Sequence, residues 1–242
     1  MADPSRQLGL LLAVAPGHPN FARAVAAIDY ALERGTRVFV YAIDEGVRAV
    51  PGEELQQRRE THPDTFALWA CAYGAEKRGL PTDDRAAYAG LSVLADLIAS
   101  TDKFVCVSQV AAPGGTRPGR RAQPPRTLVL VEADPESDPR AAEGVRIAAG
   151  VGAWELTEVT LGLRGPATDL LTGENPDDWV DGRDLANQLE AVRERPTPLT
   201  VVAFPEERAE LEPRLRETPR LEWQTPDRAT EWVGGFDAVI AL

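Results

Sequence analysis

Short, unbroken apolar runs alternate along this chain with segments in which apolar residues recur at helical spacing. Such a run is typical of a strand that is buried on both faces of a sheet. Strands that alternate with helices predict a parallel sheet with helices on both faces. In the first half of the chain, the predicted strands are residues 8–14, 37–43, 66–70 and 104–107.

Three helices are expected between these strands. Residues 21–33 carry apolar side chains at helical spacing, and Gly35 follows them as a helix stop. The other two predicted helices are residues 73–78, which Gly79 closes, and the amphipathic segment 91–99.

The second half of the chain repeats the same order of apolar runs and helical segments. The repeat rests on this pattern, because few residues are identical between the halves. Its predicted strands are residues 127–131, 156–163, 199–204 and 236–242. Its predicted helices are residues 137–149, 185–192, 206–216 and 226–233. The expected fold class is therefore α/β, with two tandem doubly wound parallel-sheet domains.

A stretch rich in proline, glycine and arginine separates the two halves. Residues 111–125 contain four prolines, three glycines, three arginines and no acidic residue, so they have little that can enter a core. We expect a first domain at 1–110, a linker at 111–125 and a second domain at 126–242.

Composition excludes several classes of function. The net charge of −12 argues against binding to nucleic acid or anionic membranes, which requires clustered basic residues. Two cysteines and two histidines are too few for a disulfide framework or a typical zinc site. The chain carries no glycine-rich phosphate-binding motif, no secretory signal and no apolar run near the ~18 residues of a membrane span. We therefore expect a cytoplasmic protein with no cofactor, metal, nucleic acid or membrane partner.

Cys71 is the candidate catalytic residue. It directly follows the predicted strand 66–70 and precedes the predicted helix 73–78, so its sulfur should lie at the carboxyl end of a strand and the amino end of a helix. Ligands of parallel sheets gather at that edge, and unpaired helix amides there favour a thiolate. The alternative is that Cys71 is a small buried apolar residue, as many cysteines are.

Three basic residues are candidates to support Cys71. His18 lies in the loop after the first predicted strand, at the same sheet edge, where it would lower the pKa of the thiol or donate a proton; the alternative is an ordinary loop residue. Lys77 and Arg78 follow Cys71 by one to two helical turns.

Other reactive side chains have simpler explanations. Asp44 and Glu45 are interpreted as turn and cap residues, because consecutive side chains on an extended chain point in opposite directions. Cys106 lies in a buried-strand pattern and is expected in the core, and His62 is expected in a loop.

Two segments resemble a known family. The segment GTRVFVYAIDEGVRAV (35–50) resembles the second strand of DsrE/TusD-type sulfur-relay proteins, in which an apolar strand ends in a polar turn and Gly-Val. The segment LWACAYGAEKRGL (68–80) resembles their cysteine loop, where an Arg-Gly pair follows the cysteine by about seven residues. The resemblance covers most of residues 7–109.

The resemblance implies that Cys71 accepts sulfane sulfur as a persulfide and passes it between donor and acceptor proteins, as a sulfurtransferase or sulfur carrier. The second half is similar to the non-reactive subunits of the family, because Phe204 takes the place of Cys71 and no cysteine follows Cys106. The chain would then be a fused pseudo-dimer, and a homo-oligomer is also compatible with the family.

Two alternatives remain open. One is a non-catalytic interaction or assembly module of the same fold, in which Cys71 is incidental. The other is a small-molecule binder at the strand-edge crevice of either domain.

Overall fold

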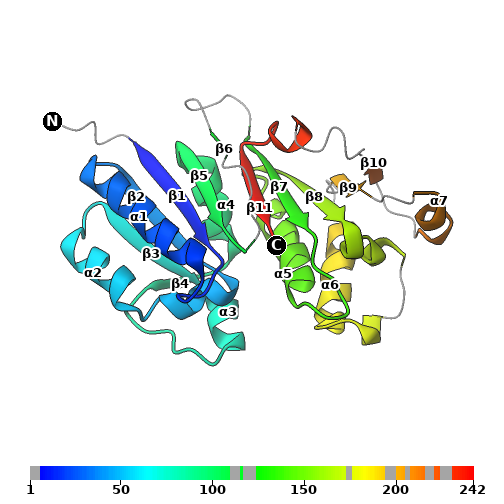
Figure 1. The fold of residues 1–242 in the computed structure, drawn as a ribbon, viewed down its shortest axis with the longest axis horizontal. Coiled ribbons are helices and arrows are strands. Elements are labelled where there is room, and N and C mark those ends of the chain that lie inside the picture. The colour runs from blue at the N-terminus through cyan, green and yellow to red at the C-terminus, as the bar shows by residue number, and fades with distance from the viewer. Residues whose placement is uncertain are drawn as a thin grey trace. The chain divides into compact units, whose positions relative to one another are not determined.

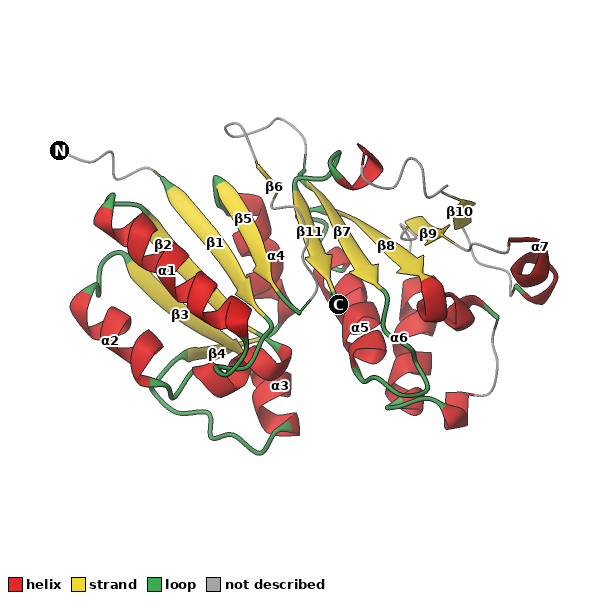
Figure 2. Cartoon of the chain, in the orientation of Figure 1, coloured by secondary structure: helices red, strands yellow, loops and turns green. Residues whose placement is uncertain are grey.

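The computed structural model divides the chain into two compact units, Met1–Gln123 and Pro124–Leu242. It describes residues 6–109, 115–116, 124–172, 176–193, 200–204, 208–215, 221–223 and 231–242. Most of the predicted linker therefore lies outside the described residues. Both units are α/β, and each is built on its own parallel sheet (Figures 1 and 2).

The sheet of the first unit has five parallel strands in the order β4-β3-β2-β1-β5, with a short antiparallel strand β6 beside β5. The strand that comes first in sequence is therefore an interior strand, fourth of the five, and the strand order reverses between β1 and β5. The strands are β1 (Gln7–Leu12), β2 (Arg37–Ala42), β3 (Phe66–Cys71), β4 (Ala87–Ala89), β5 (Lys103–Val107) and β6 (Gly115–Thr116).

Helices connect these strands. They are α1 (Pro19–Glu33), α2 (Glu53–Thr61), α3 (Ala72–Lys77) and α4 (Leu91–Ser100), with the 3-10 helix η1 (Asp44–Ala49) after β2. The three predicted helices are present as α1, α3 and α4. The prediction missed α2, which buries a single side chain, Leu55.

Both faces of the first sheet carry buried side chains. Leu10 and Leu12 point to one face, where they join a core that includes Ile28 of α1 and Leu55 of α2. Leu11 points to the opposite face and is also fully buried. Burial on both faces explains why the strands appear in the sequence as unbroken apolar runs rather than as alternating ones.

The second unit has five parallel strands in the order β10-β9-β8-β7-β11. Its strands are β7 (Arg126–Val131), β8 (Glu158–Arg164), β9 (Thr200–Phe204), β10 (Leu221–Trp223) and β11 (Ala238–Ala241). Its helices are α5 (Arg140–Gly152), α6 (Gly182–Arg193) and α7 (Arg208–Leu211), with 3-10 helices η2 (Gly165–Leu171), η3 (Pro176–Asp178) and η4 (Glu212–Arg214).

The predicted fold class is confirmed: each half of the chain forms a five-stranded parallel sheet with helices alongside. The first strand is an interior strand in both sheets, and the fifth strand pairs with the side that the second strand leaves open. One predicted helix, 206–216, is replaced among the described residues by the short α7 and η4, and most of the predicted helix 226–233 lies outside them. No helix in the described ranges is both long and apolar enough to cross a bilayer.

Candidate functional site

The carboxyl ends of β1, β2 and β3 meet at one edge of the first sheet. Their register pairs Leu12 with Ala42 and Ala42 with Ala70, so the strands end side by side. The loop after β1 carries His18, η1 after β2 begins with Asp44 and Glu45, and Cys71 is the last residue of β3. The sequence predicted this common edge correctly.

Cys71 ends β3 and caps α3, as predicted. Its Sγ accepts a hydrogen bond from the Gly74 N–H at 3.4 Å. The residue is buried, with 1% of its surface exposed. The helix amide therefore reaches the sulfur, while solvent does not reach it in this conformation.

Arg78, the C-cap of α3, connects that helix to η1. Its Nε donates to Glu45 Oε1 at 2.8 Å, and its Nη2 forms an ion pair with Asp44 Oδ1. Its Nη1 donates to the Gly74 carbonyl oxygen at 3.3 Å. Gly74 thus contacts Cys71 through its amide and Arg78 through its carbonyl. Arg78 is thus linked to the thiol through the backbone of α3.

The expectation that Asp44 and Glu45 point in opposite directions is wrong. Both carboxylates bind Arg78. The expectation assumed an extended chain, but β2 ends at Ala42 and Asp44 has a left-handed backbone with φ 49°. That turn brings the two side chains to the same guanidinium, and Asp44 is held there with only 8% of its side chain exposed.

Glu45 gives the site a dependence on pH. Partial burial acts to raise the pKa of its carboxyl, but hydrogen bonds and charges from Arg78 and Arg48 together outweigh burial and hold the pKa below the ordinary 4.5. A carboxyl with a lower pKa in the folded state stabilises the fold above its ordinary pKa, and this contribution is lost as the pH falls through the folded value.

We therefore expect Glu45→Gln to remove an acid-sensitive part of the stability. Wild type should lose its advantage over E45Q below about pH 4.5, and the difference should stay within ~1 kcal/mol because the pair is partly exposed to solvent. Urea unfolding at several pH values between 3 and 7 measures both proteins. A constant difference across that range would contradict the assignment.

His18 acts as a helix cap in this structure. Its Nδ1 accepts a hydrogen bond from the Asn20 N–H at 3.1 Å at the start of α1. Asn20 in turn donates from Nδ2 to the Ser108 carbonyl oxygen at 2.9 Å, which ties the loop after β1 to the end of β5. Strand β2 lies between β1 and β3. His18 therefore lies at the same edge of the sheet as Cys71. It belongs to the loop after β1, whereas Cys71 ends β3.

The remaining candidates lie apart from Cys71. Lys77 is exposed on the last turn of α3. His62 caps the end of α2 through its backbone, as expected for a loop residue. Cys106 lies on β5, where it pairs with Leu11 of β1, and it is half-buried rather than fully buried. Two strands separate β5 from β3, which sets the cysteines roughly 14 Å apart at ~4.8 Å per strand, too far for a disulfide.

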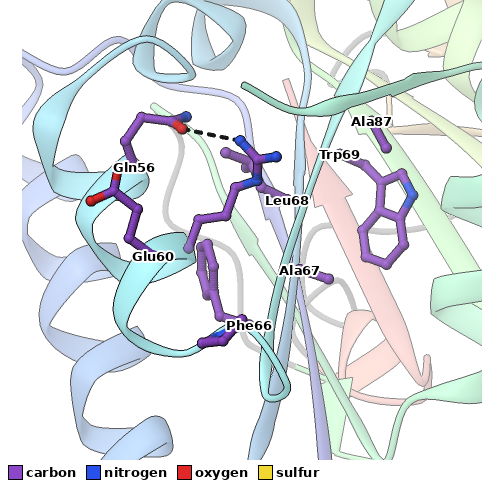
Figure 3. A pocket seen from close by; sticks show the side chains of 9 residues that line it. Gln56, Glu60, Phe66, Ala67, Leu68, Trp69 and Ala87 are labelled. Carbon is purple, nitrogen blue, oxygen red and sulfur yellow. Dashed lines mark hydrogen bonds between the residues drawn. The ribbon is translucent and has the colours of Figure 1, made fainter. Parts of the chain in front are cut away.

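The sequence did not predict the groove beside β3. It has a volume of about 530 Å³ and lies between α2 and the edge of the sheet (Figure 3). β4 pairs only with the last three residues of β3, so the first half of that strand borders the groove. Its lining residues are Gln56, Arg59, Glu60, Pro63, Phe66, Ala67, Leu68, Trp69 and Ala87. Cys71 does not line it.

The second unit has an aromatic residue where the first has its thiol. Phe204 ends β9, as Cys71 ends β3, and is buried. Its ring packs against Trp232 at 5.3 Å between centroids. In this unit, the position that corresponds to Cys71 is therefore part of an aromatic cluster.

Metal chemistry has no support at either sheet in the parts of the chain that the structure describes. No three His, Cys, Asp or Glu side chains lie together there in a way that would hold a metal ion.

Comparison of the chain with protein-family models, with curated proteins and with solved structures finds no match to any of them.

Proposed function

We propose that the first unit is a sulfur carrier, in which Cys71 accepts sulfane sulfur as a persulfide and passes it to a partner protein. The observation that supports this is the hydrogen bond from the Gly74 N–H to Cys71 Sγ, at the carboxyl edge of a parallel sheet. An amide at a helix start favours negative charge on sulfur, both in the thiolate and in a terminal persulfide.

The transfer itself needs no external oxidant. The Cys71 thiol loses its proton, and the thiolate attacks the outer sulfur of a donor persulfide R–S–SH. A bond forms between Cys71 Sγ and the outer sulfur, the donor's S–S bond breaks, and the donor leaves as a thiolate that takes up the proton. Cys71–SH and R–S–SH thus become Cys71–S–SH and R–SH. The reverse exchange with an acceptor thiol delivers the sulfur.

The test is a mass measurement on the full chain after incubation with cysteine persulfide. The peptide that contains Cys71 should gain one sulfur, ~32 Da, in wild type and in Cys106→Ser, and should gain nothing in Cys71→Ser. Cys106, which is half-buried, shows how much persulfide forms on a second thiol of the same chain. If Cys71 stays unmodified while Cys106 reacts, the proposal is wrong.

A second function, a non-catalytic assembly module, is favoured by the burial of Cys71. With 1% of its surface exposed, Cys71 fills space in the core as a small apolar residue would. This proposal expects Cys71→Ala to keep the oligomeric state of wild type in sedimentation velocity, with no persulfide on Cys71 in either protein. A persulfide on Cys71 of wild type contradicts it.

A further inference from the structure

Cys71 is buried at the start of α3, which is a short helix. The helix spans only six residues, and its Gly74 amide donates a hydrogen bond to Cys71 Sγ. A Cβ on Gly74 would lie 3.4 Å from Val47 Cγ1 and 3.7 Å from the Asp44 nitrogen, so the helix packs closely on η1 at this point. Separation of α3 from η1 is therefore a movement that would open this side of the thiol.

Arg78 is the side chain that joins these two elements by charge. One guanidinium, with 13% of the side chain exposed, contacts both carboxylates of η1 and the carbonyl of Gly74. Arg48 also binds Glu45, with Nε 2.7 Å from Oε2, but it belongs to η1 itself and is about half exposed. The two arginines thus share a carboxylate, and Arg78, unlike Arg48, connects η1 to α3.

We propose that Arg78 is a positioning residue that latches α3 over Cys71 and sets how often the thiol opens to a reactant. Its biological meaning rests on the proposed function, but the opening can be measured without any sulfur donor. In the closed state the guanidinium compensates the buried Asp44 carboxylate. Without that cation, burial of the carboxylate is less favourable, so conformations that admit water between α3 and η1 become more populated.

The experiment measures alkylation of Cys71 by iodoacetamide in the full chain carrying Cys106→Ser. Arg78→Gln should raise the alkylation rate of Cys71 at least tenfold in the absence of denaturant. Arg48→Gln is the matched control: it removes an arginine from the same Glu45 but leaves the link to α3, and its rate should stay within about twofold of the background. Arg78→Lys, which keeps the charge but loses the forked geometry, should give an intermediate rate.

A second readout separates local opening from loss of overall stability. The alkylation rate of R78Q should rise with urea concentration far less steeply than the equilibrium constant for global unfolding does. The reason is that little surface is exposed when α3 alone moves. If R78Q is too unstable to purify, Glu45→Gln removes one arm of the latch and should raise the alkylation rate above that of Arg48→Gln. Equal rates for the Arg78 and Arg48 variants, or alkylation that follows global unfolding, would overturn the latch.

The outcome is independent of the sulfur-carrier test. Faster alkylation in R78Q without persulfide formation on wild type keeps the latch and rejects the carrier function. Persulfide formation on wild type with an unchanged alkylation rate in R78Q keeps the carrier function and rejects the latch.

Discussion

Replacing Gly46 with alanine is expected to lower the free energy of unfolding of the first unit by about 3 kcal/mol. A Cβ at this position would lie 1.9 Å from the Leu12 carbonyl oxygen, and a backbone atom cannot move aside as a side-chain end can. The 3-10 helix η1 would have to shift away from β1. Because η1 carries both carboxylates that bind Arg78, the same change should also raise the alkylation rate of Cys71.

Gly17→Ala provides the control for this prediction. Gly17 lies in the loop after β1, and a Cβ there would meet no atom within 4 Å. Its stability should stay within ~0.5 kcal/mol of wild type. Urea unfolding followed by circular dichroism compares the variants, and hydrogen exchange of the first-unit peptides locates the loss. Equal stability of the two variants would contradict the close approach of η1 to β1.

Leu12→Ala should cost about 3 kcal/mol of unfolding free energy, within the usual range of ~2–5 kcal/mol for a buried leucine. Leu12 is 1% exposed at the end of β1, an interior strand, where it packs in the core formed with α1 and α2. Truncation removes its contacts and leaves a cavity that neighbours on two sides of β1 cannot fill without moving.

Leu8→Ala is the matched variant for Leu12. Leu8 is on the same strand and the same face but only partly buried at the edge of that core. Its truncation should cost roughly 1 kcal/mol, because less apolar surface is buried and solvent fills the space. Chemical denaturation in urea measures both, and a cost for L8A that equals that of L12A would contradict the described core.

The strands of the first sheet could be predicted because burial on both faces leaves a clear signal. Residues 8–14, 37–43 and 66–70 are unbroken apolar runs, and they appear as β1, β2 and β3 with ends shifted by one or two residues. The place of Cys71 followed from the end of the third run and the helix after it. A parallel register then brought the three loops to one edge without further information.

Helix α2 could not be predicted by the same reasoning. Its sequence, EELQQRRET, has one apolar residue, Leu55, so it shows no periodic apolar stripe. Tertiary contacts hold it: Leu55 is fully buried, and Arg58 forms an ion pair with Asp29 of α1. Such contacts join residues far apart in sequence, which a pattern within one segment does not contain.

The connection between Arg78 and η1 was missed for a related reason. It depends on the left-handed backbone of Asp44, which is uncommon for a residue with a side chain. Without that turn, Asp44 and Glu45 would diverge and only one of them would meet the guanidinium. The sequence left the burial of Cys71 as an open alternative, because the spacing of residues does not show how the elements around Cys71 pack.

The interior place of the first strand in each sheet has a consequence for synthesis of the protein on the ribosome. One side of β1 is covered by β2 soon after both emerge, but the other side waits for β5, after residues 13–102 have been made. At roughly 5–20 residues per second, that interval is on the order of ten seconds. β7 waits for β11 in the same way, across residues 132–237. During translation each nascent sheet therefore presents an unprotected edge that chaperones or neighbouring chains can reach.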